Sequence, residues 1–174
     1  MIIDSREMVR EAYSACGVVM PDDAWGKPWQ EWLPKQISNK GLARAVHKEK
    51  TERYLQMIAS ERPMTLPGYE LARFLMNRGL ADVFFLTGAD HRAAALILET
   101  LRFSKMQLLR ANATRVQKIA ALRKHLHENT HCGRVIYIDD DPAAAYDIGK
   151  KTALETIHYH GQTVEEMVND IWTP

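Results

Sequence analysis

The chain has 174 residues, 46% of them hydrophobic, and its 23 basic and 22 acidic side chains leave a formal net charge of +1. That balance lacks the basic excess of a general nucleic-acid binder, no apolar run reaches membrane-spanning length, and the N-terminus has no basic-then-apolar signal pattern. Cys16 and Cys132 stand alone, without metal-site or redox spacing. We therefore expect a globular cytoplasmic protein with one sizeable core and neither membrane nor nucleic acid as a partner.

The first 62 residues predict helices. Asp4 and Glu7 have the spacing of a capping box, and the apolar stripe that follows them ends at Gly17. Residues 18–38 combine three prolines with three tryptophans, which indicates short helical turns packed by the aromatic side chains. Residues 39–61 predict a long helix whose apolar face consists of Leu42, Ala45, Val46, Tyr54, Met57 and Ile58. The basic residues of this region are either a solvated face or a surface that steers an anionic substrate.

From residue 63 onward, helical patterns alternate with short apolar runs. Helices are predicted over 67–79, 90–101, 114–128 and 164–172 and from residue 142 onward, and strands over 82–86, 106–109, 135–138 and 154–159. This alternation is typical of an α/β fold with a doubly wound, mostly parallel sheet. We assign residues 1–16 and 63–174 to an α/β core and residues 17–62 to a helical insertion.

The most informative run is 134–142, Arg-Val-Ile-Tyr-Ile-Asp-Asp-Asp-Pro. Here a buried strand ends in three carboxylates, at the edge where open α/β sheets bind ligands. Pro142 makes Asp141 the expected N-cap of the next helix. Two like charges about 4 Å apart repel by roughly 1 to 4 kcal/mol, which favours a bound cation. Asp139 and Asp140 are therefore candidate Mg²⁺ ligands, and the alternative is an acidic surface turn.

Two further positions could contact an anion. Thr87 and Gly88 lie between a predicted strand and a predicted helix, where a hydroxyl and backbone amides could bind phosphate. The alternative is an ordinary strand-to-helix turn. Lys118 could neutralise phosphate charge, or it could be a solvated helix lysine, with Lys105 or Lys124 in the functional role instead.

The order and spacing of these motifs resemble those of the haloacid dehalogenase (HAD) superfamily of Mg²⁺-dependent phosphohydrolases. The resemblance is carried by Asp4-Ser5, Pro67-Gly68 with Gly79, Phe84 to Gly88, Lys118, and Ile138-Asp139-Asp140. It implies a HAD-like Rossmannoid core with a small helical cap, Mg²⁺ as cofactor, and phosphomonoester hydrolysis on a small phosphorylated substrate. It also implies catalytic roles for Lys118 and Thr87, phosphate binding by Thr87, Gly88 and Lys118, and metal binding by Asp139 and Asp140.

One family motif has no counterpart in this sequence. The family's first strand ends in Asp-x-Asp-Gly, whose first Asp is the nucleophile, and it would fall before Met1. The resemblance therefore implies that the central first strand is missing or incomplete, and we expect the chain alone to be inactive. A second chain or an upstream segment could supply that strand. The alternative is a catalytically dead HAD-like binding or scaffold protein that recognises a phosphorylated ligand or a protein partner.

Overall fold

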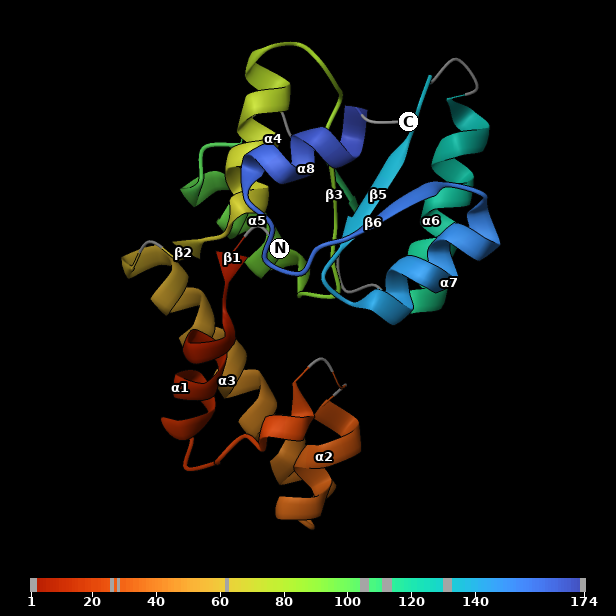
Figure 1. Cartoon of the computed structure of the whole chain (residues 1–174). Coiled ribbons are helices and arrows are strands. Elements are labelled where there is room, and N and C mark those ends of the chain that lie inside the picture. Colours follow the sequence, from red (N-terminus) through yellow and green to blue (C-terminus); the bar gives the residue numbers. More distant parts are fainter. Residues whose placement is uncertain are drawn as a thin grey trace. The chain divides into compact units, whose positions relative to one another are not determined.

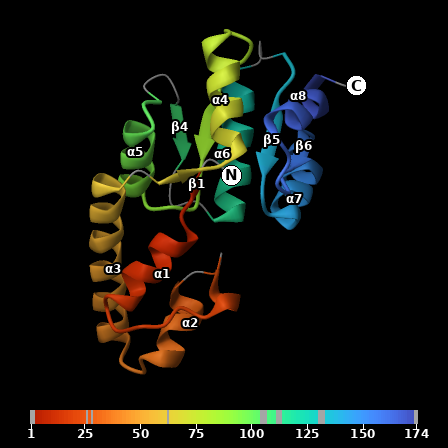
Figure 2. The same cartoon turned by 60° about the vertical axis from the view of Figure 1, so that its left-hand side comes forward.

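The computed structural model describes residues 3–25, 27, 29–61, 63–103, 107–110, 114–129 and 133–172. They form two compact units, a helical unit (Asp4–Met64) and an α/β unit that holds Ile3 and the residues from Thr65 onward (Figures 1 and 2). The chain passes between the units at β1 (Ile3–Asp4) and β2 (Met64–Thr65), which pair with each other. The helical unit thus begins at Asp4, whereas the sequence had placed its start at residue 17.

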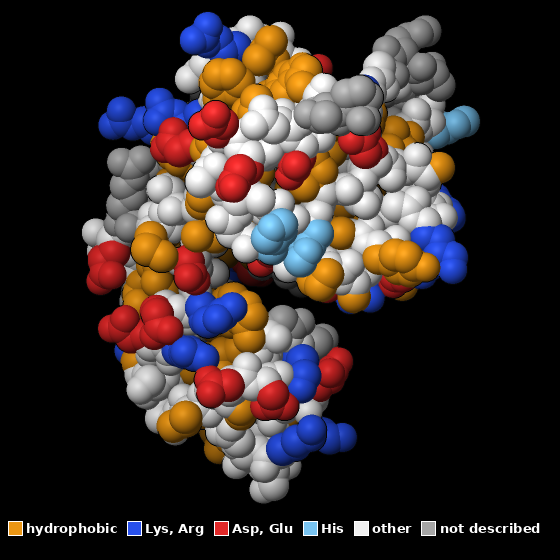
Figure 3. Space-filling model, in the orientation of Figure 1, with side chains coloured by type: hydrophobic (Ala, Val, Ile, Leu, Met, Phe, Trp, Pro, Cys, Tyr) orange, Lys and Arg blue, Asp and Glu red, His pale blue; other side chains and the backbone are white. Residues whose placement is uncertain are grey.

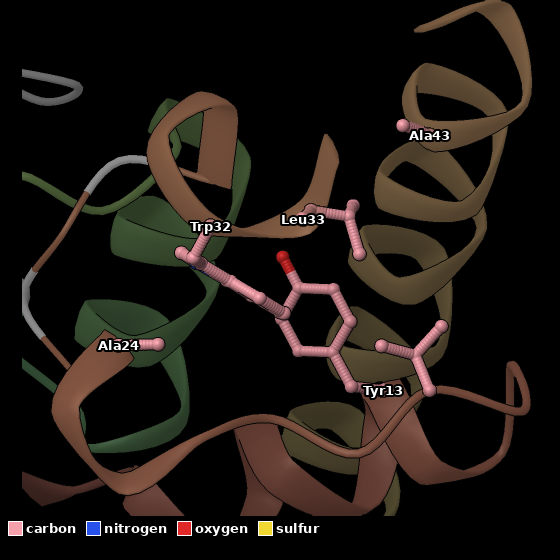
Figure 4. Close-up of a cluster of buried hydrophobic side chains, with 6 residues drawn as sticks. Tyr13, Ala24, Trp32, Leu33 and Ala43 are labelled. Atoms are coloured by element: carbon pink, nitrogen blue, oxygen red, sulfur yellow. The ribbon is translucent and has the colours of Figure 1, made fainter. Parts of the chain in front are cut away.

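The helical unit contains α1 (Arg6–Ser14), a 3₁₀ turn (Asp22–Ala24), α2 (Trp29–Gln36) and α3 (Lys40–Ser60). Its core is a cluster of buried side chains, most of which Figure 4 shows: Tyr13, Val18, Ala24, Trp32, Leu33 and Ala43. Helix α1 belongs to this unit because Tyr13 packs edge-on against Trp32, with 4.9 Å between the ring centroids. The ring of Trp29 stacks on His47 at 4.8 Å, so two of the three clustered tryptophans form core as predicted.

Three local predictions in this unit are wrong. Trp25 is 37% exposed and lies under the Arg6 guanidinium instead of in the core. Leu42 is 55% exposed and Ala45 is exposed as well, because α3 turns Ala43, Tyr54 and Ile58 inward. The expected capping box is absent as well. Ser5 is the N-cap of α1 without a side-chain bond, and the Asp4 carboxylate instead accepts a hydrogen bond from the Arg6 amide at 3.0 Å.

The α/β unit alternates helices and strands as predicted, and each strand lies within two residues of its expected position. Its elements are α4 (Pro67–Asn77), β3 (Phe84–Leu86), α5 (His91–Thr100), β4 (Gln107–Arg110), α6 (Arg115–Glu128), β5 (Ile136–Asp139), α7 (Pro142–Thr152), β6 (Glu155–His158) and α8 (Val164–Trp172). Side-chain caps start four of the helices: Asp90 caps α5, Thr114 forms a capping box on α6 with Gln117, Asp141 caps α7, and Thr163 caps α8 together with Glu166. These polar caps satisfy amides that have no partner within the helix.

The described strands of this unit form two separate parallel pairs, β3 with β4 and β5 with β6. No described strand joins β3 to β5. The fold is therefore mixed α/β, mostly helical with small parallel sheets, and the expected single sheet is divided between β3 and β5. Gly149 lets α7 approach β6 closely, because a Cβ at this position would lie 3.1 Å from the Thr156 side chain.

Helices cover both pairs in two apolar layers. One layer joins α4 and α8 through Leu71, Leu75, Tyr159, Met167 and Ile171, and Ile136 and Ile138 of β5 pack against it together with Val83. The other joins α6, β5 and α7 through Ile119, Leu122, Tyr137 and Ile148, and Leu86 of β3 and Leu109 of β4 pack against it. Val116 of α6 lies outside this layer and is 74% exposed, although it is apolar. Both layers thus reach residues beside or within β3 and β5, although the two strands are not hydrogen-bonded.

No helix of the described chain is long and apolar enough to span a membrane.

Candidate functional site

A buried ion pair lies at the carboxyl end of β5. Asp139 Oδ2 accepts hydrogen bonds from Lys118 Nζ, at 3.1 Å, and from the Tyr137 hydroxyl. Asp139 Oδ1 accepts one from the Asp141 backbone amide at 3.0 Å. The side chains of Lys118 and Asp139 are only 18% and 9% exposed. We call Lys118, Tyr137 and Asp139 the Asp139 cluster.

The cluster holds Asp139 in its charged form. Burial alone would raise the pKa of Asp139, but the Lys118 ammonium, the Tyr137 hydroxyl and the Asp141 amide together outweigh burial and leave the pKa below its usual value. Burial, reinforced by the adjacent Asp139 charge, raises the pKa of Tyr137. The phenol therefore keeps its proton and remains a hydrogen-bond donor to Asp139.

This environment predicts a loss of stability in acid. Because the folded state lowers the pKa of Asp139, its contribution is complete above the unfolded value of about 3.9 and is lost as the pH falls through the lower folded value. Urea unfolding in EDTA, measured between pH 6 and pH 2.5, should show a smaller fall in the Asp139→Asn variant than in the wild type. The control is Asp23→Asn. The bond to Lys27 also lowers the pKa of Asp23, but this carboxylate is fully exposed and solvent screens the pair, so its removal should leave the fall in stability close to that of the wild type. Parallel curves for wild type and Asp139→Asn would contradict the prediction.

The other two acids of the run have different surroundings. Asp141 is the N-cap of α7, as predicted: one of its oxygens accepts from the Ala143 amide at 2.9 Å, and the other lies 3.1 Å from the Arg115 guanidinium. Arg115 also bonds Asp147 at 3.1 Å and so links the start of α6 to α7. Asp140 is exposed, and within the described chain its carboxylate makes no hydrogen bond or ion pair. Asp140 is thus the carboxylate of the three that is open to a ligand from solution.

The donor set is compatible with Mg²⁺. Carboxylate oxygens are its preferred protein ligands, and it commonly takes one or two of them while keeping several waters. Asp140 is open to such an ion, whereas Asp139 would have to exchange one of its three hydrogen bonds for the metal in order to join it. Among the described residues, no group of three or more His, Cys, Asp or Glu side chains converges on one metal position. The residues therefore suit a hydrated ion held from one side and not a closed protein cage.

Thr87 and Gly88 form the turn between β3 and α5. The Thr87 hydroxyl oxygen accepts a hydrogen bond from the Ala89 amide at 3.1 Å, which leaves the hydroxyl proton available for donation. Gly88 is exposed. In Figure 1 the chain leaves β3 and β5 at the same, lower end of the strands. The turn and the Asp139 cluster thus share an edge of the unit, but no described contact joins them, and phosphate binding by Thr87 and Gly88 stays a prediction.

The other lysines considered from the sequence lie elsewhere. Lys124 forms an exposed pair with Glu128 at 3.7 Å, and Lys105 lies outside the described residues. Sequence reasoning missed two residues of the site, Tyr137 and Arg115. Tyr137 could have been found, because alternation along a strand places positions 137 and 139 on the same face. No sequence signal marks Arg115, whose partners lie 26 and 32 residues away.

Charged side chains are mixed on the molecular face shown in Figure 3, where acidic and basic groups alternate without an extended basic field among the described residues. On the α/β unit, His158 and His160 are exposed with ring centroids 5.7 Å apart. His158 is the register partner of Asp139 across the β5–β6 pair. The carboxyl ends of β5 and β6 therefore bring imidazoles as well as carboxylates to one edge.

The described elements thus define a mixed α/β protein that resembles a hydrolase fold. The structure is similar to the crystal structure of a hydrolase from Streptococcus pneumoniae TIGR4, with a TM-score of 0.56 over 98% of this chain and 92% of that chain. The two sequences are 14% identical, so the likeness concerns the fold alone. No protein-family model and no curated protein matches the sequence.

Proposed function

We propose that this protein is a HAD-like, Mg²⁺-dependent phosphohydrolase that acts on a small phosphorylated substrate. The observation that carries the proposal is the largely buried contact of 3.1 Å between Lys118 and Asp139, beside the exposed Asp140. It joins a cation suited to phosphate and carboxylates suited to Mg²⁺ at the carboxyl end of a parallel strand, where open α/β folds bind ligands. The hydrolase-like fold supports the same class of protein.

Each residue has a separate role in the proposed reaction. The Lys118 ammonium, the Thr87 hydroxyl and the Gly88 amide hold the phosphate oxygens. Asp139 and Asp140 hold Mg²⁺, which when bound neutralises phosphate charge during in-line displacement. Tyr137 orients the Asp139 carboxylate. The reaction also needs an aspartate nucleophile. The 174 residues contain no Asp-x-Asp-Gly sequence, and we propose that they have no phosphatase activity by themselves.

A Mg²⁺ titration tests the metal site. In ¹⁵N-labelled protein, Mg²⁺ should shift the amide resonances of residues 139–141, and Asp140→Asn should weaken binding by at least about tenfold, since even a residue that only orients a metal ligand commonly costs 10- to 100-fold in affinity when it is lost. The matched control is Asp170→Asn, which removes an exposed carboxylate from α8. Equal Mg²⁺ affinity in Asp140→Asn and Asp170→Asn would overturn the assignment.

An activity assay tests the proposed need for an external nucleophile. With Mg²⁺ and p-nitrophenyl phosphate, the purified chain should release no p-nitrophenol above the buffer rate. Robust turnover that disappears in Asp139→Asn would show that these residues contain a complete catalytic site. That result would refute the proposed inactivity while supporting the enzymatic class.

One observation favours a binding protein as the second candidate. Lys118 and Asp139 already neutralise each other, and the Tyr137 hydroxyl and the Asp141 amide complete the hydrogen bonding of the carboxylate. A cluster of this kind can serve a dead HAD-like scaffold that recognises a phosphorylated ligand or a protein partner. Binding of inorganic phosphate without turnover, even when an Asp-x-Asp-Gly strand is supplied, would favour this candidate.

A further inference from the structure

Two exposed imidazoles lie close together where β6 ends. The ring centroids of His158 and His160 are 5.7 Å apart, and neither ring has a role in the proposed reaction. Imidazole nitrogens are common ligands of Zn²⁺ and of other divalent transition-metal ions. One ion bound to two imidazoles, with zinc–nitrogen bonds of about 2.0–2.1 Å, holds the ring centroids roughly 5 to 6 Å apart. The observed separation therefore suits a shared ion.

A hydrogen bond fixes the tautomer of His160. Its Nδ1 lies 3.2 Å from the backbone carbonyl oxygen of His158. A carbonyl oxygen can only accept a hydrogen bond, so Nδ1 carries the proton and donates it. The lone pair of the neutral ring then lies on Nε2. Metal-binding histidines commonly have this arrangement, in which a bond from one ring nitrogen to a carbonyl orients the other nitrogen for the metal.

A buried amide holds the turn that carries both rings. The side chain of Gln162 accepts a hydrogen bond from the His160 amide at 2.7 Å and donates one to the His158 carbonyl at 3.1 Å. Gly161 allows this turn, because its φ of +101° is one that residues with a side chain rarely adopt. Ligands on a fixed turn lose less conformational freedom on binding than ligands on a flexible loop. The two imidazoles are thus held in place before any ion binds.

The surroundings favour a cation but do not complete a cage for it. Bonds to the Thr163 amide and hydroxyl, with a smaller contribution from the nearby His160, lower the pKa of Glu166, so this carboxylate stays charged close to the ring. Among the described residues, no third His, Cys, Asp or Glu side chain converges on one position with the two imidazoles. A tetrahedral ion held by both rings would keep its other two positions for water or an anion.

We propose that His158 and His160 form a binding site for a divalent transition-metal ion such as Zn²⁺, separate from the Mg²⁺ site proposed at Asp139 and Asp140. The types of donor distinguish the two sites, because imidazole nitrogen suits Zn²⁺ whereas Mg²⁺ prefers oxygen. His160 binds through Nε2, and Gln162 is the positioning residue. Structural zinc sites have four protein ligands, so an ion held by two is open to solvent and exchangeable.

A Zn²⁺ titration of the full chain, prepared without a histidine tag and with Mg²⁺ in excess, tests the site. In ¹⁵N-labelled protein, Zn²⁺ should shift the amide resonances of residues 158–162. His158→Gln and His160→Gln should each weaken this binding by at least about tenfold, because the loss of even an orienting residue commonly lowers metal affinity by about 10- to 100-fold. Gln162→Met should weaken it as well, since methionine keeps the length of the side chain but makes neither bond of the turn. The matched control is His127→Gln, which removes an exposed histidine from α6 and should leave the affinity unchanged.

Three results would overturn the proposal. One is equal Zn²⁺ affinity in His158→Gln and His127→Gln, and another is a set of shifts confined to residues outside 158–162. The third is a loss of Zn²⁺ affinity in Asp140→Asn as large as that in His158→Gln, because the ion would then lie at the carboxylates. Unchanged Zn²⁺ affinity in Asp140→Asn supports a separate site, and unchanged affinity in Gln162→Met would refute the positioning role of Gln162.

Discussion

Replacement of Lys118 by methionine is expected to lower the free energy of unfolding by about 3 kcal/mol, because it leaves a buried carboxylate without its cation. Methionine retains most of the aliphatic stem, so the change isolates the ammonium group. Asp139 is 9% exposed, and of its three donors only the Tyr137 hydroxyl and the Asp141 amide would remain. A loss of this size corresponds to a decrease in Tm of roughly 6 to 12 °C for a chain of this length. Urea unfolding followed by far-UV circular dichroism measures it.

Helix α6 offers a matched control. Lys124→Met removes another lysine from this helix, but Lys124 and Glu128 are 75% and 57% exposed, so their pair is expected to contribute about 0.5 kcal/mol or less. The double variant Lys118→Met with Asp139→Asn should regain most of the lost stability, because it no longer buries a lone charge. Similar losses of unfolding free energy for Lys118→Met and Lys124→Met would mean that the Lys118–Asp139 pair contributes no more to stability than an exposed ion pair.

The double variant also bears on function. Buried ion pairs are often no more stabilising than neutral groups of similar shape, because desolvation offsets the Coulomb attraction. If the neutralised cluster is as stable as the wild type, stability alone does not account for Lys118 and Asp139. A role at a charged ligand then accounts for the pair, and the neutralised variant should lose Mg²⁺ binding while it remains folded.

Local chemistry was sufficient to predict the β5–α7 segment. The β-branched run before Asp139 indicates a strand, Pro142 suits a first helical turn, and Asp141 suits the cap, so every signal lies within a few residues. The Asp139 cluster depends on a different kind of information. Lys118 precedes Asp139 by 21 residues, and only the packing of α6 against β5 brings the two side chains together. The motif order indicated Lys118 as a candidate, but no sequence pattern indicates that Asp139 is its partner.

Amphipathic patterns identified the helices better than they identified the packed faces. Leu42 and Val116 are apolar residues next to a buried stripe, and a helix rotated by part of a turn leaves them in solvent. Trp25 is likewise indistinguishable by type from the buried Trp32. The sequence also could not show to which unit α1 belongs. The apolar stripe of α1 indicates that one face of the helix is buried, but it does not indicate which side chains cover that face. Thr87 presents the same ambiguity, since an ordinary turn and a phosphate loop share one local sequence.

Truncation of Leu33 and of Ile148 to alanine is expected to destabilise different units, each by about 3 kcal/mol, the usual cost of a cavity in a packed core. Both side chains are fully buried, Leu33 in the core of the helical unit and Ile148 between α7 and the Asp139 face of β5. Three of the four tryptophans (Trp25, Trp29 and Trp32) lie in the helical unit, so tryptophan fluorescence follows mainly that unit. Leu33→Ala should shift the fluorescence transition to lower urea. Ile148→Ala should instead accelerate hydrogen exchange of the β5 and α6 amides.

Exposed residues provide the controls for this pair. Val19 is 80% exposed in the helical unit and Tyr146 is 66% exposed on α7, so truncating either to alanine should change stability by no more than about 0.5 kcal/mol. If Leu33→Ala and Ile148→Ala shift both readouts equally, the units unfold as one body. Separate responses would mean that each core maintains its own unit. The Asp139 cluster would then depend on the α/β core alone, and the helical unit could vary in sequence without disturbing the site.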